Sequence, residues 1–417
     1  MKRLLLVCYY FPPLGGAGIN RPLALFKQLP TFDWNVHVLT VKSVTYRMYE
    51  PDLLESLDTE HIYRSGSRDP QRLMWLMGLR QVKPRAIERA RPASDRFFPD
   101  SKTGWLRPAV RLGRTLVANQ QYDALVSTSP PITCHLVARQ LAREAKLPWI
   151  ADFRDYWTSR KPAQWYRTNS QVDRAEKLLA EIAKQATTTV AVNDAVGEYI
   201  GAMRTIPNAY DPDLTIHWQQ PDPRQFVIGL LGTYNDMLPI APLITVLERL
   251  RQTHPGLYDR VKILHAGDID PDWLHSQLPA SPVAKRFTSL GFLPRQEAVA
   301  KLSAASVFYM CLASEADLGI TTARVYDMIA SGRPIMAALP GEGELSNLLS
   351  QFEHSLVYPP NRPQPAAEWL ANRIAIHERG EVAIATDTPQ IKQYSSQKLA
   401  ERYARLLNEV IGSPPAT

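Results

Sequence analysis

The sequence predicts an α/β protein with two doubly wound domains that face each other across a cleft. Three observations support this prediction. The 417 residues are enough for two hydrophobic cores. Buried-strand patterns alternate with helix patterns in two consecutive series, as in parallel sheets that helices cover on both faces. Between the two series, Pro207, Pro212, Pro221 and Pro223 lie close together, which is typical of an interdomain linker.

The first domain is predicted to comprise residues 1–206. Residues 3–9 form an apolar run that is typical of a strand buried on both faces of a parallel sheet. A glycine-rich turn links this strand to a helix near residues 23–29. The later elements of the domain are predicted strands at 35–40, 122–127, 149–152 and 188–192, and predicted helices at 132–146 and 170–185.

Two places in the first domain carry candidate site residues. The backbone at Gly15 and Gly16 can approach an anion closely. Many first crossovers carry glycines only for packing, however, and the dinucleotide pattern Gly-x-Gly-x-x-Gly is absent here. Asp152, Arg154 and Asp155 lie at the carboxyl end of a predicted strand, where open α/β sheets bind ligands. The alternative is a local salt bridge between Arg154 and its neighbouring aspartates.

Residues 64–114 carry much of the net charge of +7, because basic residues strongly outnumber acidic ones there. Apolar residues such as Trp75 and Phe97 are interleaved with them. Anionic lipid attracts such segments by about 1 kcal/mol per basic residue near the surface. We therefore expect this segment to bind an anionic membrane surface, with a merely solvated basic face as the alternative. No nucleic-acid partner is expected, because no motif that reads DNA or RNA accompanies the charge.

Residues 207–224 are predicted as a linker, residues 225–389 as the second domain, and residues 390–417 as a crossover helix and tail. The second domain begins with a strand at 226–231, followed by Gly232 and Thr233. Its later elements are predicted strands at 261–266, 287–290 and 307–312, and predicted helices at 240–252, 295–304 and 366–378. The terminal helix, from 395 or 396 to about 411, carries one apolar stripe at helical spacing, formed by Leu399, Tyr403, Leu406 and Val410.

Residues 317–339 read as a tight turn, a short helix, a stop and a buried strand, and they suggest a phosphate site. A hydroxyl of Thr321 or Thr322 can cap the helix, and its free N–H groups attract anions. Arg324 adds a cation whose donors can fork onto phosphate oxygens. Asp327, one turn later, can accept hydrogen bonds from a ribose diol. The alternative is that Arg324 and Asp327 simply pair with each other on the surface.

The composition is that of an ordinary soluble globular protein, with 45% hydrophobic and 21% charged residues. The three cysteines are far apart and show neither a disulfide framework nor a zinc spacing, which favours a reducing compartment. The N-terminal apolar run is short and ends in two prolines, so we do not expect a signal peptide. No apolar run approaches the length of a membrane span. No metal-binding cluster is visible, and no metal or cofactor is expected.

With both halves laid out, the chain resembles the retaining glycosyltransferases of family four, which have the GT-B fold. The resemblance spans nearly the whole length and is strongest in a bacterial branch that builds cell-surface polysaccharides. The residues that carry it are Tyr10-Phe-Pro-Pro-x-Gly-Gly, Phe98-Pro-Asp with Trp105, Ser129-Pro-Pro, Ala151-Asp-Phe-Arg-Asp-Tyr-Trp, Pro207-Asn-Ala-Tyr-Asp, Gly232-Thr-Tyr and Ala323-Arg-Val-Tyr-Asp-Met-Ile-Ala-Ser-Gly-Arg-Pro-Ile.

The resemblance implies a role for each candidate residue. Gly15 and Gly16 would approach the donor diphosphate from the first domain, and the sugar and acceptor side would be lined by Asp152, Arg154 and Asp155. The terminal helix would cross back to the first domain. The second domain would bind the donor, with the turn at Gly291 and Phe292 beside the base and Asp327 at the ribose. Its further donor residues would be Gly232, Thr233, Ile320, Thr321, Thr322, Ala323 and Arg324.

Three positions depart from the family pattern. The usual pair of glutamates, eight residues apart, would fall at Gly319 and Asp327, so the first carboxylate is missing and the second is shortened. Glu315 or Asp317 could replace the first one. The arginine and lysine that often follow the first strand of the second domain are not evident, because Thr233-Tyr-Asn-Asp-Met stands there. Asn208-Ala209 replaces the more usual Asn-Gly.

The resemblance implies a metal-independent enzyme of the hexosyltransferase type that moves a sugar from a nucleotide-diphosphate sugar to a glycan or lipid-linked acceptor. The expected location is cytoplasmic, peripheral on the inner membrane face. The leaving phosphate would take the acceptor's proton during attack on the same face of the sugar. Two alternatives stay open. One is a catalytically silent subunit of an assembly complex, which the missing carboxylate supports. The other is a sugar-nucleotide epimerase on the same fold.

Overall fold

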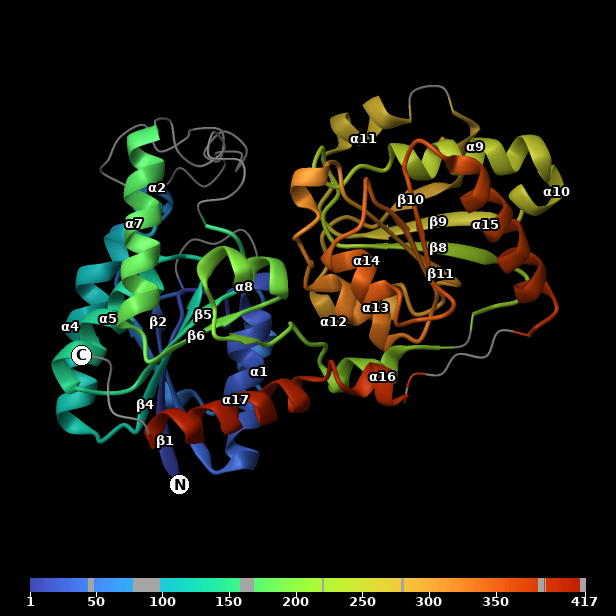
Figure 1. Ribbon diagram of the computed structural model, residues 1–417. Helices are drawn as coiled ribbons and strands as arrows, with labels where there is room; N and C mark the ends of the chain where they lie inside the picture. The colour runs from blue at the N-terminus through green and yellow to red at the C-terminus, as the bar shows by residue number, and fades with distance from the viewer. Residues whose placement is uncertain are drawn as a thin grey trace. The chain divides into compact units, whose positions relative to one another are not determined.

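The structure is a computed structural model, and it describes residues 1–43, 49–77, 98–157, 169–219, 221–278, 281–381, 386 and 388–412. The chain divides into two compact units (Figure 1). The first unit comprises Met1–Asn208 and Ser396–Thr417, and the second comprises Ala209–Ser395. The sequence placed the corresponding boundaries at residues 206 and 390, close to these positions.

The first unit contains a seven-stranded sheet in the order β3-β2-β1-β4-β5-β6-β7, and all neighbouring strands run parallel. Its central strands are buried on both faces, which explains their continuous apolar runs. The strands are β1 (Lys2–Val7), β2 (Trp34–Val41), β3 (Ile62–Ser65), β4 (Ala124–Ser129), β5 (Trp149–Phe153), β6 (Thr188–Ala191) and β7 (Arg204–Thr205).

Helices cover the sheet of the first unit (Figure 1). Side chains of α4, α5 and α7 share one apolar cluster with the sheet, whereas α17 packs beside α1. The helices are α1 (Asn20–Gln28), α2 (Pro70–Leu76), α4 (Leu106–Asn119), α5 (Thr133–Ala145), α7 (Asn169–Gln185), α8 (Asp194–Ile200) and α17 (Ser396–Ile411). Short 3-10 helices lie at Ala17–Ile19, Leu29–Phe32, Pro51–Leu54, Thr59–His61 and Thr103–Trp105.

The second unit contains a six-stranded parallel sheet in the order β10-β9-β8-β11-β12-β13. Its strands are β8 (Phe226–Leu231), β9 (Val261–Ala266), β10 (Phe287–Ser289), β11 (Val307–Cys311), β12 (Ile335–Ala338) and β13 (Leu356–Tyr358). Along β11, Val307 and Tyr309 face one apolar cluster while Phe308 and Met310 face the other. This alternation places a hydrophobic layer on each side of the sheet.

Helices cover both of these layers in the second unit (Figure 1). Side chains of α9 and α15 belong to one layer, and those of α12, α13 and α14 belong to the other. The helices are α9 (Ala241–Thr253), α10 (Pro255–Tyr258), α11 (Pro271–Gln277), α12 (Arg295–Lys301), α13 (Arg324–Ala330), α14 (Glu344–Leu349), α15 (Pro363–Glu378) and α16 (Pro389–Lys392). Short 3-10 helices lie at Pro212–His217, Pro282–Arg286 and Glu315–Asp317.

The predicted fold class is confirmed: two doubly wound parallel sheets follow each other along the chain. The terminal helix also follows its prediction, because α17 belongs to the first unit and the side chains of its apolar stripe are buried. Three short strands, β3, β7 and β13, were not predicted. β3 overlaps the start of the basic segment, where no strand was predicted, and it pairs with β2. A four-residue edge strand with a partly exposed pattern leaves little periodic signal.

The predicted linker is also not a free connection. Most of its described residues belong to the second unit, where Pro212–His217 form a 3-10 helix. Arg333 explains this packing. Its guanidinium lies 5.1 Å from the ring of Trp218 and donates to the carbonyl of Gln219. The proline-rich segment is therefore packed against the second unit and is not an unpacked linker.

Candidate functional site

Both sheets reverse their strand order at their first strand, and this fixes where each unit can bind a ligand. β1 lies between β2 and β4, and β8 lies between β9 and β11. The connections leave such a pair of neighbouring strands toward opposite sides, so a crevice opens at the carboxyl ends of the strands. In each unit, ligand-binding residues are therefore expected near this point.

Arg324 reaches the end of β8 from 93 residues away in the sequence. Its Nη1 donates to the carbonyl of Leu231 at 2.7 Å and to that of Thr233 at 2.8 Å. Its guanidinium also lies 5.0 Å from the centre of the Tyr234 ring. These contacts fix the orientation of the Arg324 guanidinium beside the point where the strand order reverses. The residue remains partly exposed.

The Gly232 carbonyl, which lies between those of Leu231 and Thr233 in the chain, contacts the buried side chain of His265. His265 Nε2 lies 2.9 Å from the Gly232 oxygen, and His265 Nδ1 lies 2.9 Å from Ser289 Oγ. Because the carbonyl can only accept, Nε2 carries the proton and Nδ1 accepts from the Ser289 hydroxyl. Burial lowers the pKa of His265, which favours this neutral form. The side chains of Arg324 and His265 thus take up three consecutive carbonyls of the turn.

Glycine is required where these strand ends meet. Gly232 has φ +88°, and Gly291 has φ +72°, a region that favours glycine. A Cβ on Gly267 would stand 2.1 Å from the Gly232 oxygen. The backbone N–H of Gly267 donates to the Gly291 carbonyl at 2.8 Å, and that of Gly232 donates to the Ala266 carbonyl at 2.8 Å. The turns after β8, β9 and β10 therefore form one connected edge.

Several hydrogen-bond donors at this edge have no acceptor among the described residues. They are the backbone N–H groups of Thr233, Thr322 and Ala323 and the hydroxyl of Thr322, whose oxygen is buried. The predicted side-chain cap of the helix is wrong. Ala323 stands at the N-cap of α13, and no side chain caps the helix. Ala323 already has helical φ and ψ, and the Thr322 hydroxyl has no partner among the described residues.

Asp327 forms an ion pair with Arg295 instead of pairing with Arg324. Arg295 Nε lies 3.0 Å from Asp327 Oδ2, and Arg295 Nη2 contacts the other oxygen. Asp327 is buried in α13, and Arg295 begins α12, which packs on the same face of the sheet. A role of Asp327 at the ribose stays a prediction, and its partner Arg295 was not predicted, because the two residues are 32 positions apart.

The position of the missing carboxylate remains without an evident replacement. Gly319 is buried, and Asp317 is buried with its carboxylate accepting from Ser314 Oγ at 2.7 Å. Glu315 is exposed. The other predicted donor residues lie in the same unit. Ile320 and Thr321 belong to the turn before α13, and the side chain of Phe292 is exposed beside Gly291. An aromatic side chain in that position is able to stack on a base.

In the first unit, the Gly15–Gly16 turn holds a carboxylate of the protein itself. Glu50 is buried, and its Oε1 accepts from the backbone N–H of Gly16 at 3.3 Å. Gly16 has φ +84°. The Gly16 N–H is thus directed at a carboxylate, and the predicted contact of this turn with a donor diphosphate stays a prediction. The sequence did not single out Glu50, because it follows the turn by a whole helix and strand.

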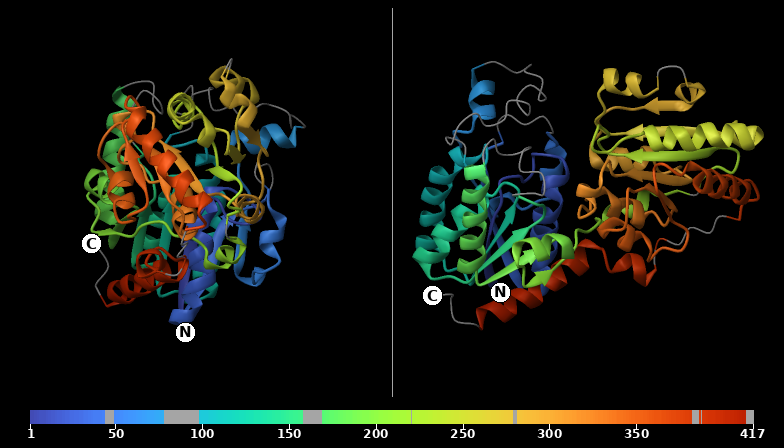
Figure 2. Two further views of the ribbon diagram at one scale, coloured as in Figure 1. Left: turned by 90° about the vertical axis from the view of Figure 1, so that its right-hand side faces the viewer. Right: turned by 45° about the horizontal axis from the view of Figure 1, so that its top comes forward.

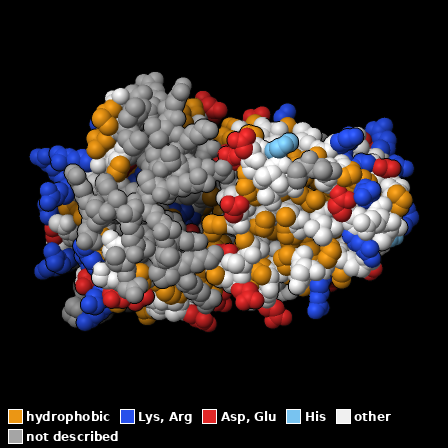
Figure 3. Space-filling view, turned by 90° about the horizontal axis from the view of Figure 1, so that it is seen from above, with side chains coloured by type: hydrophobic (Ala, Val, Ile, Leu, Met, Phe, Trp, Pro, Cys, Tyr) orange, Lys and Arg blue, Asp and Glu red, His pale blue; other side chains and the backbone are white. Residues whose placement is uncertain are grey.

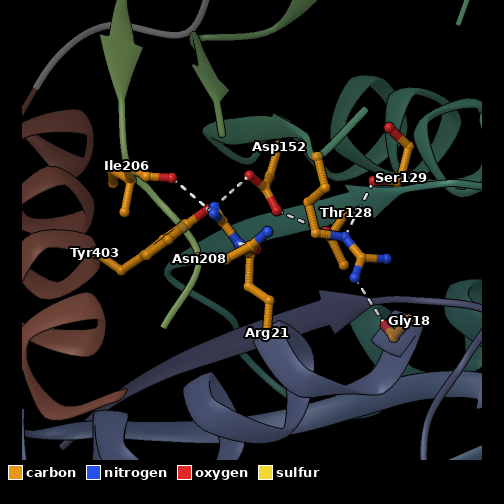
Figure 4. A network of polar contacts seen from close by, with 9 residues as sticks. Gly18, Arg21, Thr128, Ser129, Asp152, Ile206, Asn208 and Tyr403 are labelled. Carbon is orange, nitrogen blue, oxygen red and sulfur yellow. Dashed lines mark hydrogen bonds and ion pairs between the residues drawn. The ribbon is translucent and has the colours of Figure 1, made fainter. Parts of the chain in front are cut away.

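Asp152 lies in a buried polar network instead of at an open surface (Figure 4). Its Oδ1 forms a 2.9 Å ion pair with Arg21, and its Oδ2 accepts from Thr128 Oγ1 at 2.6 Å. Arg21 also donates to the Tyr403 hydroxyl, the Ile206 carbonyl and the Asn208 side chain. The network ties α1, β5 and α17 together. A catalytic role for Asp152 stays a prediction, and its contacts indicate a positioning role.

Arg154 also faces backbone carbonyls. It donates to the carbonyl of Ser129 at 3.1 Å and to that of Gly18 at 2.8 Å, and burial lowers its pKa. The local salt bridge that the sequence left open is replaced by the Arg21–Asp152 pair and these carbonyl contacts. Asp155 is exposed and accepts from the N–H of Tyr156. Asp155 has the most exposed surface of the three predicted catalytic residues, but burial of its carboxyl group raises the pKa.

The basic segment is not one solvated face. Arg64 donates to the carbonyls of Val41 and Pro12, and Arg72 is buried. Lys102 is buried 3.6 Å from the carboxylate of Asp69, and burial lowers its pKa. These cations stabilise the unit from within and are not available to lipid. Residues 78–97, which contain many of the basic residues of this segment, lie outside the described residues.

Neither a metal-binding cluster nor a helix able to cross a membrane occurs among the described residues. No group of three or more His, Cys, Asp and Glu side chains is placed there to hold a metal ion. No helix in that part of the chain has the length and apolar character needed to cross a bilayer. The three cysteines are buried and free.

No protein-family model and no curated protein sequence matches this chain. Solved structures do match it over its full length. A sucrose-phosphate synthase from Thermosynechococcus elongatus superposes with a TM-score of 0.64 at 13% identity, covering 99% of this chain and 100% of that one. This chain has the GT-B fold.

Two further structures with this fold match equally completely. The Anabaena protein HepE, in complex with UDP and glucose, gives a TM-score of 0.60 at 15% identity and covers 98% of this chain and 100% of its own. The lipopolysaccharide outer core galactosyltransferase WaaB, in its apo form, gives a TM-score of 0.57 at 12% identity, with 99% of each chain covered. At these identities the likeness establishes the fold.

Proposed function

We propose that this protein is a retaining, metal-independent glycosyltransferase of the hexosyltransferase type. It moves a sugar from a nucleotide-diphosphate sugar to a glycan or lipid-linked acceptor in surface-polysaccharide synthesis. The observation that carries the proposal is the position of Arg324, whose guanidinium is anchored at the strand-order reversal of the second unit by two backbone carbonyls. A cation fixed at this point is suited to a diphosphate.

The donors around Arg324 support the same ligand. The N–H groups of Thr233, Thr322 and Ala323 lack acceptors among the described residues, and so does the Thr322 hydroxyl. Phosphate oxygens accept several hydrogen bonds at once and satisfy such groups. The helix dipole plays a small part, because α13 has only 7 residues. Arg324 therefore supplies the main charge.

Sugar transfer needs a stabilised leaving group. The bond between the anomeric carbon and the diphosphate oxygen breaks, and the acceptor oxygen forms a new bond on the same face of the sugar. The acceptor's proton passes to the leaving diphosphate, so no separate base is required. Negative charge grows on the diphosphate as its bond breaks, and a preorganised guanidinium with backbone N–H groups lowers the energy of that state. In this proposal, that is the role of Arg324 and its neighbours.

The comparisons support the choice of probe. HepE has been solved with UDP and with UDP-glucose, and it shares the fold over the full length. We therefore expect a uridine diphosphate to be a ligand of this chain as well. Isothermal titration of the full chain with UDP, UDP-glucose and a panel of other nucleotide sugars tests this directly.

The decisive variant is Arg324→Ala. We expect it to weaken UDP binding by about 1.5–3 kcal/mol, the scale of hydrogen bonds to charged groups. Arg324→Lys keeps the charge but loses the fork, so it should recover only part of the affinity. Arg251→Ala, at a surface arginine paired with Glu248 on α9, is the matched control and should bind like wild type. Unchanged binding in Arg324→Ala would refute the phosphate site.

Product analysis separates the enzyme from the two alternatives. Transfer to acceptor extracts, insensitive to a metal chelator and with the anomeric configuration kept by NMR, supports the proposal. Donor binding without turnover on any extract favours a silent subunit. Two observations support that alternative: a glycine stands at position 319, and Asp317 is buried and accepts a hydrogen bond from Ser314. Conversion of the donor without any acceptor identifies an epimerase.

Membrane association belongs to the same proposal and rests on α2. Leu73, Leu76 and Met77 are 45%, 59% and 67% exposed, on and directly after this short helix. α2 projects beyond the sheet of the first unit (Figure 2, right), and Figure 3 shows hydrophobic side chains exposed on that unit. The sequence continues into arginine-rich residues 78–97. Exposed apolar side chains next to cationic ones favour an anionic lipid surface, and the expected location is the cytoplasmic membrane face.

Sedimentation with anionic vesicles tests this part independently. The full chain should bind vesicles at low salt and release them at high salt. The triple variant Leu73→Ser, Leu76→Ser and Met77→Ser should bind less. Val357→Ser, at another exposed apolar residue, is the control. Equal binding by wild type and triple variant would remove α2 from the contact.

A further inference from the structure

The carboxylate of Glu50 occupies the glycine turn of the first unit. The side chain is only 8% exposed, and its Oε1 lies 3.3 Å from the backbone nitrogen of Gly16. Gly16 has φ +84°, so this N–H is presented by a left-handed backbone that favours glycine. Turns of this kind bind anions through their N–H groups. Here the anion is part of the protein.

The backbone delivers Glu50 to this place. Its own N–H donates to the Pro13 carbonyl at 2.8 Å, and the preceding Tyr49 forms an antiparallel bridge with Leu14. These contacts lay residues 49–50 along the start of the turn. A Cβ on Gly15 would stand 2.0 Å from Glu50 Oε1, so only glycine leaves room for the carboxylate. The fit is specific to this pair of residues.

The carboxylate is poorly compensated for a buried charge. Its described hydrogen bonding consists of the one long contact to Gly16, and no ion pair to Glu50 is found among the described residues. A buried carboxylate is normally paired or receives several short hydrogen bonds. Glu50 is therefore held in place mainly by the backbone contacts of residues 49–50, so an anion that binds the Gly16 N–H more strongly can displace its carboxylate.

We propose that Glu50 is an internal ligand of this turn, which an anionic group of the substrate displaces when it binds. The inference rests on the proposed function in taking a nucleotide diphosphate as that group. A phosphate and a carboxylate at the same Gly16 N–H repel each other strongly, so both cannot occupy the turn. Binding must then expel Glu50, and the unliganded protein is closed to weak anions.

The test uses the full chain and titrates UDP and, separately, inorganic pyrophosphate. Glu50→Gln keeps the size of the side chain and removes its charge, and we expect both ligands to bind roughly tenfold more tightly, since they no longer compete with a carboxylate for the Gly16 N–H. Glu50→Asp, which retracts the charge from Gly16, should show a smaller gain. It keeps the test open if Glu50→Gln folds poorly. Glu55→Gln, at an exposed acid five residues later, is the matched control and should not change either affinity.

The outcomes decide the inference separately from the proposed function. Tighter anion binding by Glu50→Gln or Glu50→Asp supports it, even if no nucleotide sugar is ever turned over. Unchanged or weaker binding in both variants overturns it and makes Glu50 a fixed part of the turn. If wild-type binding of UDP depends on Arg324 while neither Glu50 variant alters it, the proposed function stands and this inference falls.

Discussion

Arg21 and Asp152 form a fully buried ion pair in the first unit. Arg21 Nη1 lies 2.9 Å from Asp152 Oδ1, and the two side chains are 1% and 0% exposed. Arg21 comes from α1 and Asp152 from the end of β5, and Tyr403 of α17 contacts the same guanidinium nitrogen. The pair therefore fixes the place where the C-terminal helix joins the first unit, and it removes Asp152 from solvent.

The first prediction follows from this burial. Asp152→Ala should lower the free energy of unfolding by about 3–5 kcal/mol, because it leaves the Arg21 charge buried without a partner. Chemical denaturation followed by circular dichroism measures the change. Asp155→Asn, at the exposed neighbour, should stay within about 0.5 kcal/mol of wild type.

A paired replacement separates charge from packing. Arg21→Met combined with Asp152→Leu should recover much of the stability lost in Asp152→Ala, since two apolar side chains can replace a buried ion pair. If Asp152→Ala instead unfolds like wild type but abolishes transfer, Asp152 has a direct role in the reaction after all.

The second prediction concerns the histidine behind the donor turn. His265→Leu should weaken UDP binding, because the Gly232 carbonyl and the Ser289 hydroxyl lose their partner, and it should cost about 1–3 kcal/mol of stability. His265→Gln retains a donor and should recover part of both. The same titration and denaturation experiments give the two values.

The matched control for the histidine is His275→Leu on α11, an exposed position. It should leave UDP affinity and stability near wild type. UDP affinity equal to wild type in His265→Leu would show that the Gly232 carbonyl does not need to be held, and that the turn is rigid without the ring.

The third prediction is a pH dependence from His135 on α5. This ring is fully buried, with Nδ1 2.8 Å from Ser127 Oγ, and burial lowers its pKa to about 3. In the unfolded chain a histidine titrates near its ordinary pKa of about 6.5. Below about pH 6.5 this histidine is therefore protonated in the unfolded chain but stays neutral in the folded protein. Stability contributed by neutral His135 is complete above about pH 6.5 and is lost as the pH falls toward 3.

Denaturation series between pH 7 and pH 4 test this sign. Each pH unit within the window costs up to about 1.4 kcal/mol for one such group. His135→Gln should flatten the slope, whereas His254→Gln, at an exposed site, should leave it unchanged. A slope in His135→Gln equal to that of wild type would mean that other groups cause the acid sensitivity.

Much of the fold was readable from local patterns. The strands at β8 and β9 and the helices α5 and α7 lie within a few residues of their predicted positions. Strands buried on both faces give continuous apolar runs, and helices give stripes, so both are visible in the sequence. β3 was missed because a short edge strand has neither signal.

The candidate site was only partly readable. Its position at the ends of parallel strands follows from topology, and Arg324 was chosen for its place after a turn. Its anchoring carbonyls, the Arg295 partner of Asp327 and the carboxylate of Glu50 come from elements far away in the sequence. No periodic pattern encodes such contacts, since they depend on how distant backbone segments meet.

The sequence by itself determined two parallel-sheet units, their order and the strand ends where ligands are to be expected, because burial and turn chemistry are local properties of the chain. The tertiary structure alone decided which charges are buried and which remain available. Packing buries the side chains of Asp152 and Lys102, and it anchors Arg324 where the strand order of the second unit reverses. The physical reason is that a charge acquires its environment only when remote segments pack around it.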